Sequence, residues 1–279
     1  MTPMSAVPQF DPAALREARL QAHCAAQWLA RAARAYLPAQ DDDSHTNLGW
    51  DDGARALITR AFAGWSVALQ LSPLALVVQG GKDGPATLPL AGLDDAAAGD
   101  WLAIRLSAGG FDPAKLTAPL AYAAPDHPVS KGGRYAPAND AAFAALADWF
   151  ALGAGAITGS GAAFAAHGHG APDPRCWPHH FDFATQIAFP GAGGETAYVG
   201  AGYSPGDTFY EEPYFYVTLY PKASIDTMPS LAPIGHWRGD GFTGAVAPAS
   251  MIVGADDPRS SVATFLAIAV GAAIERLRG

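Results

Sequence analysis

The stretch VALQLSPLALVV, residues 67–78, alternates apolar side chains in two short runs, at Val67, Leu69 and Leu71 and then at Leu74, Leu76 and Val78. A period of two is typical of a strand with one buried face. No helix separates the two runs, and parallel neighbours would need a long crossover between them. The stretch therefore predicts an antiparallel sheet rather than a doubly wound parallel one.

Helical patterns and a further strand flank this stretch. Asp11 can cap a helix that starts at Pro12, where the missing N–H costs nothing, and Pro38 ends it. A shorter helical pattern spans residues 57–65. Residues 87–90 predict a strand that Pro89 confines to a sheet edge, and residues 101–106 predict a helix.

The second half repeats the order of helix, strands and helix. Asn139 or Asp140 can cap a helix, and Ser260 with Ser261 can cap the last one. Between them lie three strand-like runs, at residues 181–189, 196–202 and 214–220. We therefore expect an α+β fold, with antiparallel sheets and helices packed on one face. Residues 1–279 are expected to form a single compact domain, whose best candidate for a two-lobed division lies near residues 113–137.

Composition limits the classes of function. Half of the 279 residues are apolar, which is ample for a sizeable core, and the formal net charge is −9. Such a charge repels phosphate backbones and anionic bilayers, so we expect neither a nucleic-acid nor a membrane partner.

The cysteine count and the first ten residues predict a cytoplasmic protein. Two cysteines provide no disulfide framework, and residues 1–10 lack the basic residue and apolar core of a signal peptide. Residues 149–166 carry no charge but are mostly Ala and Gly, which favours a packed connection in a soluble protein over a membrane span.

Two glycine motifs suggest activities that their surroundings exclude. Gly-Tyr-Ser-Pro-Gly, residues 202–206, matches the nucleophile elbow of serine hydrolases, but Pro205 lacks the backbone N–H that the oxyanion hole needs. Gly200 and Gly202 follow a strand as in dinucleotide-binding loops, but acidic residues follow instead of a helix. Both motifs are interpreted as turns.

Histidines of the second half suggest a metal site. His167 and His169 lie two residues apart, and His180 with Asp182 on a strand would share one face. Together these four residues provide nitrogen and oxygen ligands for a divalent transition metal. The alternative, a hydrogen-bonded or exposed set without metal, stays open because no established metal-ligand spacing is present.

Acidic and aromatic residues alternate along residues 177–216. Asp182 and Glu212 can divide the roles of acid and base, as paired carboxylates in different environments do. Aromatic faces suit a polar organic ligand, and His45 lies beside Trp50 where it can reach the same pocket or cap a helix. The candidate substrate-binding residues are His45, Trp177, Tyr203, Tyr214 and Tyr216.

Three ordered motifs resemble a bacterial domain family without an established activity. They are Trp-Pro-His-His-Phe-Asp at residues 177–182, Ser-Pro-Gly-Asp at residues 204–207 and Glu-Pro-Tyr-Phe-Tyr-Val at residues 212–217. Members of that family often carry Glu where this chain has His179. The resemblance implies a shared site at His180, Asp182, Asp207 and Glu212 without naming a reaction.

The leading hypothesis is a small-molecule pocket with acid/base or metal-dependent chemistry. In it His180 is the general base or a metal ligand, Asp182 orients it, and Glu212 is a second acid. The alternative is a non-catalytic structural or interaction module in which these side chains satisfy one another. Whether the protein is an enzyme, whether a metal is bound and whether it forms a homo-oligomer stay open.

Overall fold

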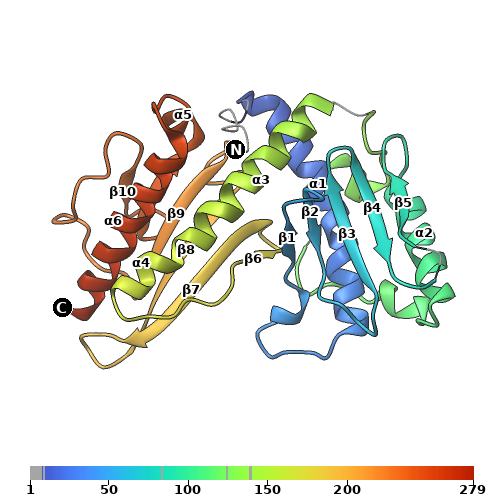
Figure 1. Ribbon diagram of the computed structural model, residues 1–279, viewed down its shortest axis with the longest axis horizontal. Helices are drawn as coiled ribbons and strands as arrows, with labels where there is room; N and C mark the ends of the chain where they lie inside the picture. The colour runs from blue at the N-terminus through green and yellow to red at the C-terminus, as the bar shows by residue number, and fades with distance from the viewer. Residues whose placement is uncertain (1–7, 9, 83, 124, 138–139) are drawn as a thin grey trace. The chain divides into compact units, whose positions relative to one another are not determined.

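The computed structural model describes residues 8, 10–82, 84–123, 125–137 and 140–279, and it has the expected α+β fold with antiparallel sheets (Figure 1). Two compact units are distinguished and are described separately. Unit 1 comprises Asp148–Pro174 and Asp182–Gly279, and unit 2 comprises Ala13–Ala147 and Arg175–Phe181. Residues 113–137, where we expected a division, lie inside unit 2.

Unit 2 contains an antiparallel sheet in the order β1-β2-β3-β4-β5. The alternation at residues 67–78 is confirmed as a strand pair, in which Val67 lies opposite Val78 and Leu69 opposite Leu76. The predicted edge strand is also present, as β5. The strands are β1 (Gly49–Asp51), β2 (Ala56–Ile58), β3 (Ser66–Leu71), β4 (Leu74–Gln79) and β5 (Ala86–Pro89).

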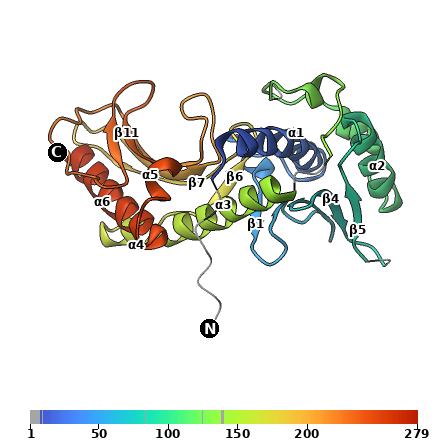
Figure 2. The same ribbon diagram turned by 90° about the horizontal axis from the view of Figure 1, so that it is seen from above.

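Two long helices accompany this sheet. Helix α1 (Pro12–Tyr36) begins at the predicted proline and runs along one face, behind the strands in Figure 1 and above them in Figure 2. Helix α2 (Asp95–Ala108) packs against β4 and β5 and is capped by Asp94. Short elements complete the unit: η1 (Ser44–Thr46), η2 (Pro113–Thr117), η3 (Pro128–Lys131) and β6 (Arg175–Trp177).

The helix predicted at residues 57–65 is wrong. Leu57 lies in β2, between Trp50 of β1 and Leu69 of β3. Ala63 and Gly64 then take positive φ angles of 46° and 80°, which no helix accommodates. A three-residue strand buried from both sides carries no alternation long enough to reveal its period.

Unit 1 contains an antiparallel sheet with the order β10-β11-β9-β8-β7. Helices α4 and α6 cover one face, in front of the strands in Figure 1 and below them in Figure 2. The strands are β7 (Asp182–Pro190), β8 (Thr196–Ser204), β9 (Tyr214–Tyr220), β10 (His236–Arg238) and β11 (Gly244–Pro248). The helices are α3 (Asp140–Gly159), which begins in unit 2, α4 (Gly161–Ala166), α5 (Ala249–Ile252) and α6 (Pro258–Arg278).

Two details of these helices differ from expectation. Residues 149–166 form the end of α3 and all of α4, not a connection, because Ala is the best helix former and outweighs the glycines. Helix α6 is capped by Asp257, whose carboxylate accepts from the Ser260 N–H, rather than by the two serines. Asn139, one alternative cap of α3, and most of residues 1–10 lie outside the described residues.

Two helical segments in the described part of the chain are long and apolar enough to cross a bilayer by length and composition. They are Asp140–Ala166 and Pro258–Arg278, and in their most apolar windows 61% and 50% of the residues are buried inside the protein. Core helices of globular proteins meet the same criteria, so these segments are weak grounds for a membrane span.

Candidate functional site

Asp182 is held by a tyrosine from two strands away in unit 1. Its Oδ2 atom accepts a hydrogen bond from the Tyr216 hydroxyl. The ring crosses the intervening strand β8 at Gly202, where a Cβ atom would overlap it. Burial, and then the Asp182 charge, raise the pKa of Tyr216 well above its usual value. Two predicted site residues are therefore brought together, but as partners of each other.

Asp207 and Tyr214 form a second pair beside the first. The Tyr214 hydroxyl donates to Asp207 Oδ2 at 2.5 Å, and the Phe209 and Tyr210 N–H groups donate to Oδ1 at 2.7 and 3.1 Å. The rings of Tyr214 and Tyr216 are 5.9 Å apart. Asp207 therefore stabilises the turn after β8, in addition to its bond with Tyr214.

Glu212 stabilises the start of α5. Its Oε2 atom accepts from the Ser250 N–H at 2.6 Å and its Oε1 atom from the Ser250 hydroxyl at 3.0 Å. A carboxylate at the first turn of a helix is favoured by the unpaired N–H groups there. Both carboxylate oxygens thus have a structural role, which leaves the predicted acid/base role without support from the geometry.

Tyr203, a predicted substrate-binding residue, belongs to the core of unit 1. Its side chain is fully buried, and its ring lies against Gly153 and 5.5 Å from the Phe150 ring. Because side chains alternate along β8, Tyr203 points to the helix-covered face while Gly202 and Ser204 point away. No ligand reaches Tyr203 in this arrangement.

His167 and His169 are held at the carboxyl end of α6. Arg278 donates to the carbonyl of His167 at 2.7 Å and to Nε2 of His169 at 2.8 Å. The His169 ring lies 4.9 Å from Phe189, seven residues along β7 from Asp182, which corresponds to about 23 Å. His169 and Asp182 therefore cannot ligate the same ion. Among the described residues, no three His, Cys, Asp or Glu side chains form a group suited to a metal.

His180 lies in an exposed turn of unit 2, two residues before β7 begins at Asp182. The intervening Phe181 has a positive φ of 60°, so strand alternation does not place His180 on the same face as Asp182. The His180 ring lies 4.2 Å from the ring of His179 between centroids. The predicted pairing of the His180 imidazole with the Asp182 carboxylate required both residues to lie in one strand. Because β7 begins at Asp182, His180 lies outside it.

The turn is fastened to α1 through the carbonyl of Pro178. His23 Nε2 donates to it at 2.8 Å, and Gln27 Nε2 donates to it at 2.9 Å. The His23 ring also stacks on Phe181 at 4.9 Å. Burial lowers the pKa of His23 to about 4, although the hydrogen bond to Pro178 opposes that shift. His23 is therefore neutral near pH 7.

The segment that carries His45 is joined to β6. Leu48 and Cys176 exchange backbone hydrogen bonds of 2.8 and 2.9 Å. His45 itself is buried, and its Nδ1 atom accepts from the Gln40 N–H at 3.2 Å. The neighbouring Thr46 and Trp177 line one pocket. His45 therefore has a structural role, whereas its neighbour Thr46 contributes to the pocket.

This pocket, which we call the aromatic pocket, has a volume of about 220 Å³. Trp177, His179 and Tyr122 form its aromatic part, with His179 5.9 Å from Trp177 and 5.6 Å from Tyr122 between ring centroids. Burial, and then the charge of His180, lower the pKa of His179. The remaining lining residues are Arg34, Asp42, Asp43, Thr46 and Leu120.

A second cavity of about 310 Å³, the α1 pocket, shares Leu120 and Tyr122 with the first. One face of α1 contributes Cys24, Gln27, Trp28 and Arg31, spaced three or four residues apart. Asp95, Pro119 and Ser130 complete the lining. Burial raises the pKa of Cys24 to about 12, so this thiol stays protonated and is a poor nucleophile.

Two polar atoms of these pockets are buried without a hydrogen-bond partner among the described residues. They are Oε1 of Gln27, which lines the α1 pocket, and the hydroxyl of Tyr122, which lines both. The orientation of the Gln27 amide is fixed, because its nitrogen donates to the carbonyls of His23 and Pro178. Leaving such an atom unpaired costs about 1–3 kcal/mol. No sequence motif marks Gln27 or Tyr122, which come together only through tertiary structure.

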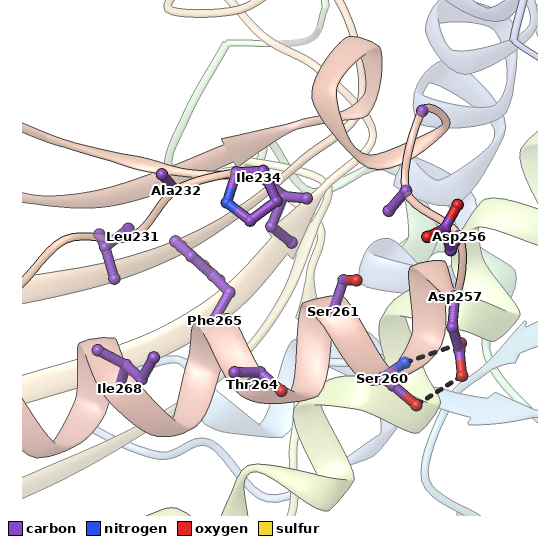
Figure 3. A pocket seen from close by; sticks show the side chains of 13 residues that line it. Leu231, Ala232, Ile234, Asp256, Asp257, Ser260, Ser261, Thr264, Phe265 and Ile268 are labelled. Carbon is purple, nitrogen blue, oxygen red and sulfur yellow. Dashed lines mark hydrogen bonds between the residues drawn. The ribbon is translucent and has the colours of Figure 1, made fainter.

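A larger cavity of about 480 Å³ in unit 1 has a different character (Figure 3). Its polar end includes Asp257, whose carboxylate accepts from the Ser260 N–H at 3.1 Å and from the Ser260 hydroxyl at 2.7 Å. Much of the remaining lining is apolar, with Leu231, Ile234 and Phe265. The Asp257 carboxylate is thus occupied by its own helix, whereas Gln27 and Tyr122 in unit 2 have unused polar atoms.

Comparison of the chain with protein-family models, with curated proteins and with solved structures found no match.

Proposed function

We propose that the chain is a small-molecule binding protein whose ligand occupies the aromatic pocket and the adjoining α1 pocket of unit 2. The carrying observation is the pair of buried, unpartnered atoms, Gln27 Oε1 and the Tyr122 hydroxyl, in side chains that line these pockets. A ligand that hydrogen-bonds to both removes a cost that the free protein bears. Trp177 and His179 provide the aromatic faces against which its apolar part packs.

Binding accounts for these features better than catalysis does. Cys24 is protonated, and the acids first considered as catalytic, Asp182 and Glu212, already bind Tyr216 and Ser250. In unit 1 the contacts therefore support the alternative in which these side chains satisfy one another. The net charge of −9 supports a partner other than nucleic acid, and two buried free cysteines are compatible with the cytoplasm.

A ligand screen with matched variants tests the proposal. Polar metabolite-sized compounds are screened by thermal shift, and each hit is measured again on Tyr122→Phe, Trp177→Leu and Tyr220→Phe. Tyr220 lies in unit 1 and is 63% exposed, so its variant is the control. We expect the two pocket variants to lose about tenfold or more in affinity and the control to lose none. A set of hits unaffected by both pocket variants would overturn the proposal.

A further inference from the structure

Arg34 contributes an unused positive charge to the aromatic pocket. It lies three residues after Arg31 on α1, is exposed, and makes no hydrogen bond or ion pair with any described residue. Arg31, by contrast, donates to the carbonyls of Leu116 and Ala118 at 3.3 and 2.8 Å. One terminal nitrogen of Arg31 is thus already engaged, whereas the guanidinium group of Arg34 has no hydrogen-bond partner among the described residues.

Asp43 contributes an unused negative charge to the same pocket. It precedes η1 but its carboxylate caps nothing, and within the described part of the chain it accepts no hydrogen bond. Its neighbour Asp42 differs, because Asp42 Oδ1 accepts from the Ser44 N–H at 2.9 Å. Asp43 has a φ of 56°, in the left-handed region that Asp and Asn adopt more readily than other non-glycine residues.

The charges of Arg34 and Asp43 both influence Tyr122 but form no ion pair with each other. Burial raises the pKa of Tyr122 to about 12; the charges of Arg31 and Arg34 oppose that shift, and the Asp43 charge adds to it. Both groups therefore lie within electrostatic reach of Tyr122. They form no ion pair, so no nitrogen of Arg34 lies within 4.0 Å of the Asp43 carboxylate.

We infer that the ligand of the aromatic pocket is a small zwitterion of the amino-acid type, with its ammonium group at Asp43 and its carboxylate at Arg34. The inference rests on the proposed function and specifies its ligand class. A zwitterion matches both unused charges at once. Its net charge of zero also spares it the repulsion that a chain of net charge −9 exerts on a free anion.

Size and lining agree with this class. The aromatic pocket, with a volume of about 220 Å³, is smaller than most ligand pockets, which suits the charged end of a ligand as small as a free amino acid. The face of Trp177 attracts an ammonium group, and Leu120 offers an apolar contact for a side chain.

The test uses standard amino acids and derivatives that lack one charge. Each free amino acid is titrated at millimolar concentration into the full-length protein, beside its methyl ester and its N-acetyl derivative. We expect at least one amino acid to bind, and its two derivatives to bind about tenfold more weakly or worse. A bound compound is assigned to the pocket if its affinity is lower for Tyr122→Phe than for the parent protein.

Charge-deleted variants assign each end of the ligand. In Arg34→Gln the preference for the acid over the ester should disappear, while the preference for the free amine stays. In Asp43→Asn the reverse is expected, and Asn tolerates the left-handed backbone. Arg34→Lys keeps the charge and should keep the preference for the acid, which separates loss of charge from loss of structure. Arg276→Gln, in unit 1, is the control.

The outcomes separate this inference from the proposed function. If uncharged or singly charged compounds bind in the pocket as tightly as zwitterions, the zwitterion inference fails and the binding function stands. If the preferences survive both Arg34→Gln and Asp43→Asn, the assignment of the charges fails. If no compound of either screen is sensitive to Tyr122→Phe, both are overturned.

Discussion

Tyr216 reaches Asp182 across the backbone of an intervening strand, through the space that the missing side chain of Gly202 leaves open. This relationship joins Asp182 and Tyr216, from two of the three ordered motifs, through Gly202, the first residue of the Gly-Tyr-Ser-Pro-Gly motif. It also explains why a motif that resembles a nucleophile elbow carries glycine at its first position. The missing side chain of Gly202 is required by the Tyr216 ring and not by catalysis.

Gly202→Ala should therefore destabilise the protein. The added methyl group overlaps the Tyr216 ring, and overpacking of this kind costs about 1–3 kcal/mol, to which the hydrogen bond to Asp182 adds when it is lost. Urea unfolding of the variant measures the effect. The matched control is Gly155→Ala in α3, where an added Cβ meets nothing within 4 Å and should stabilise by up to about 1 kcal/mol. Equal effects at the two positions would contradict the packing described for Gly202.

Tyr122→Phe should leave the free energy of unfolding unchanged or raise it, because the lost hydroxyl has no partner among the described residues. Tyr214→Phe removes the donor to Asp207 and should cost about 1–3 kcal/mol. The two variants delete the same atom, so their difference in thermal or urea unfolding isolates the role of the partner. A loss in Tyr122→Phe as large as that in Tyr214→Phe would mean that the Tyr122 hydroxyl is bonded.

His23 should make stability depend on pH between 6.5 and about 4. Burial, with smaller contributions from Arg19, His180 and His179, lowers its pKa in the folded protein to about 4 from 6.5. In that range the unfolded chain binds a proton that the folded protein does not, so stability is full above pH 6.5 and falls as pH decreases. A shift of this size corresponds to about 3 kcal/mol.

The variant that tests this is His23→Gln, which keeps a hydrogen-bond donor but does not titrate. Urea unfolding at several pH values should give a shallower decline below pH 6.5 for the variant than for the parent protein. Carboxylates that titrate at lower pH contribute equally to both and cancel in the difference. Parallel curves for the two proteins would mean that His23 accepts its proton normally in the folded state.

Glu212 and Ser250 should behave as a coupled pair. Because the carboxylate accepts two hydrogen bonds from Ser250, one from its backbone and one from its hydroxyl, Glu212→Gln should destabilise by about 1–2 kcal/mol. Ser250→Ala removes one bond only and should cost less. In the double variant the effects should not add, which a double-mutant cycle in urea measures. Additive effects would argue against direct contact between the side chains.

Long, regular patterns made much of the fold predictable. The apolar spacing of α1 and the alternation of residues 67–78 extend over several turns or strand positions, so their periods are unambiguous. The failure at residues 57–65 has the opposite cause. There β2 is three residues long, and its burial from both sides comes from pairing with β1 and β3, which is invisible locally.

The candidate site was less predictable. The motif at residues 177–182 did point to Trp177, but the side chains that complete its pocket come from α1, from the acidic run before η1 and from the connection at residues 118–122. Those segments are distant in sequence, and their convergence follows from tertiary packing. The carboxylates predicted to be catalytic, Asp182 and Glu212, instead accept hydrogen bonds from Tyr216 and Ser250 within unit 1.

The nitrogen and the oxygen of the Gln27 amide have different roles. Its nitrogen donates to the carbonyl of Pro178, the residue after Trp177, whose side chain lines the aromatic pocket. Its oxygen is buried, and the Gln27 side chain lines the α1 pocket. The amide is conjugated, so a donor at its oxygen polarises the N–H groups and tightens their bonds. The part of a ligand that donates to this oxygen in the α1 pocket should therefore strengthen the hydrogen bond to Pro178, beside Trp177 of the aromatic pocket, so that the two parts of the ligand favour each other's binding.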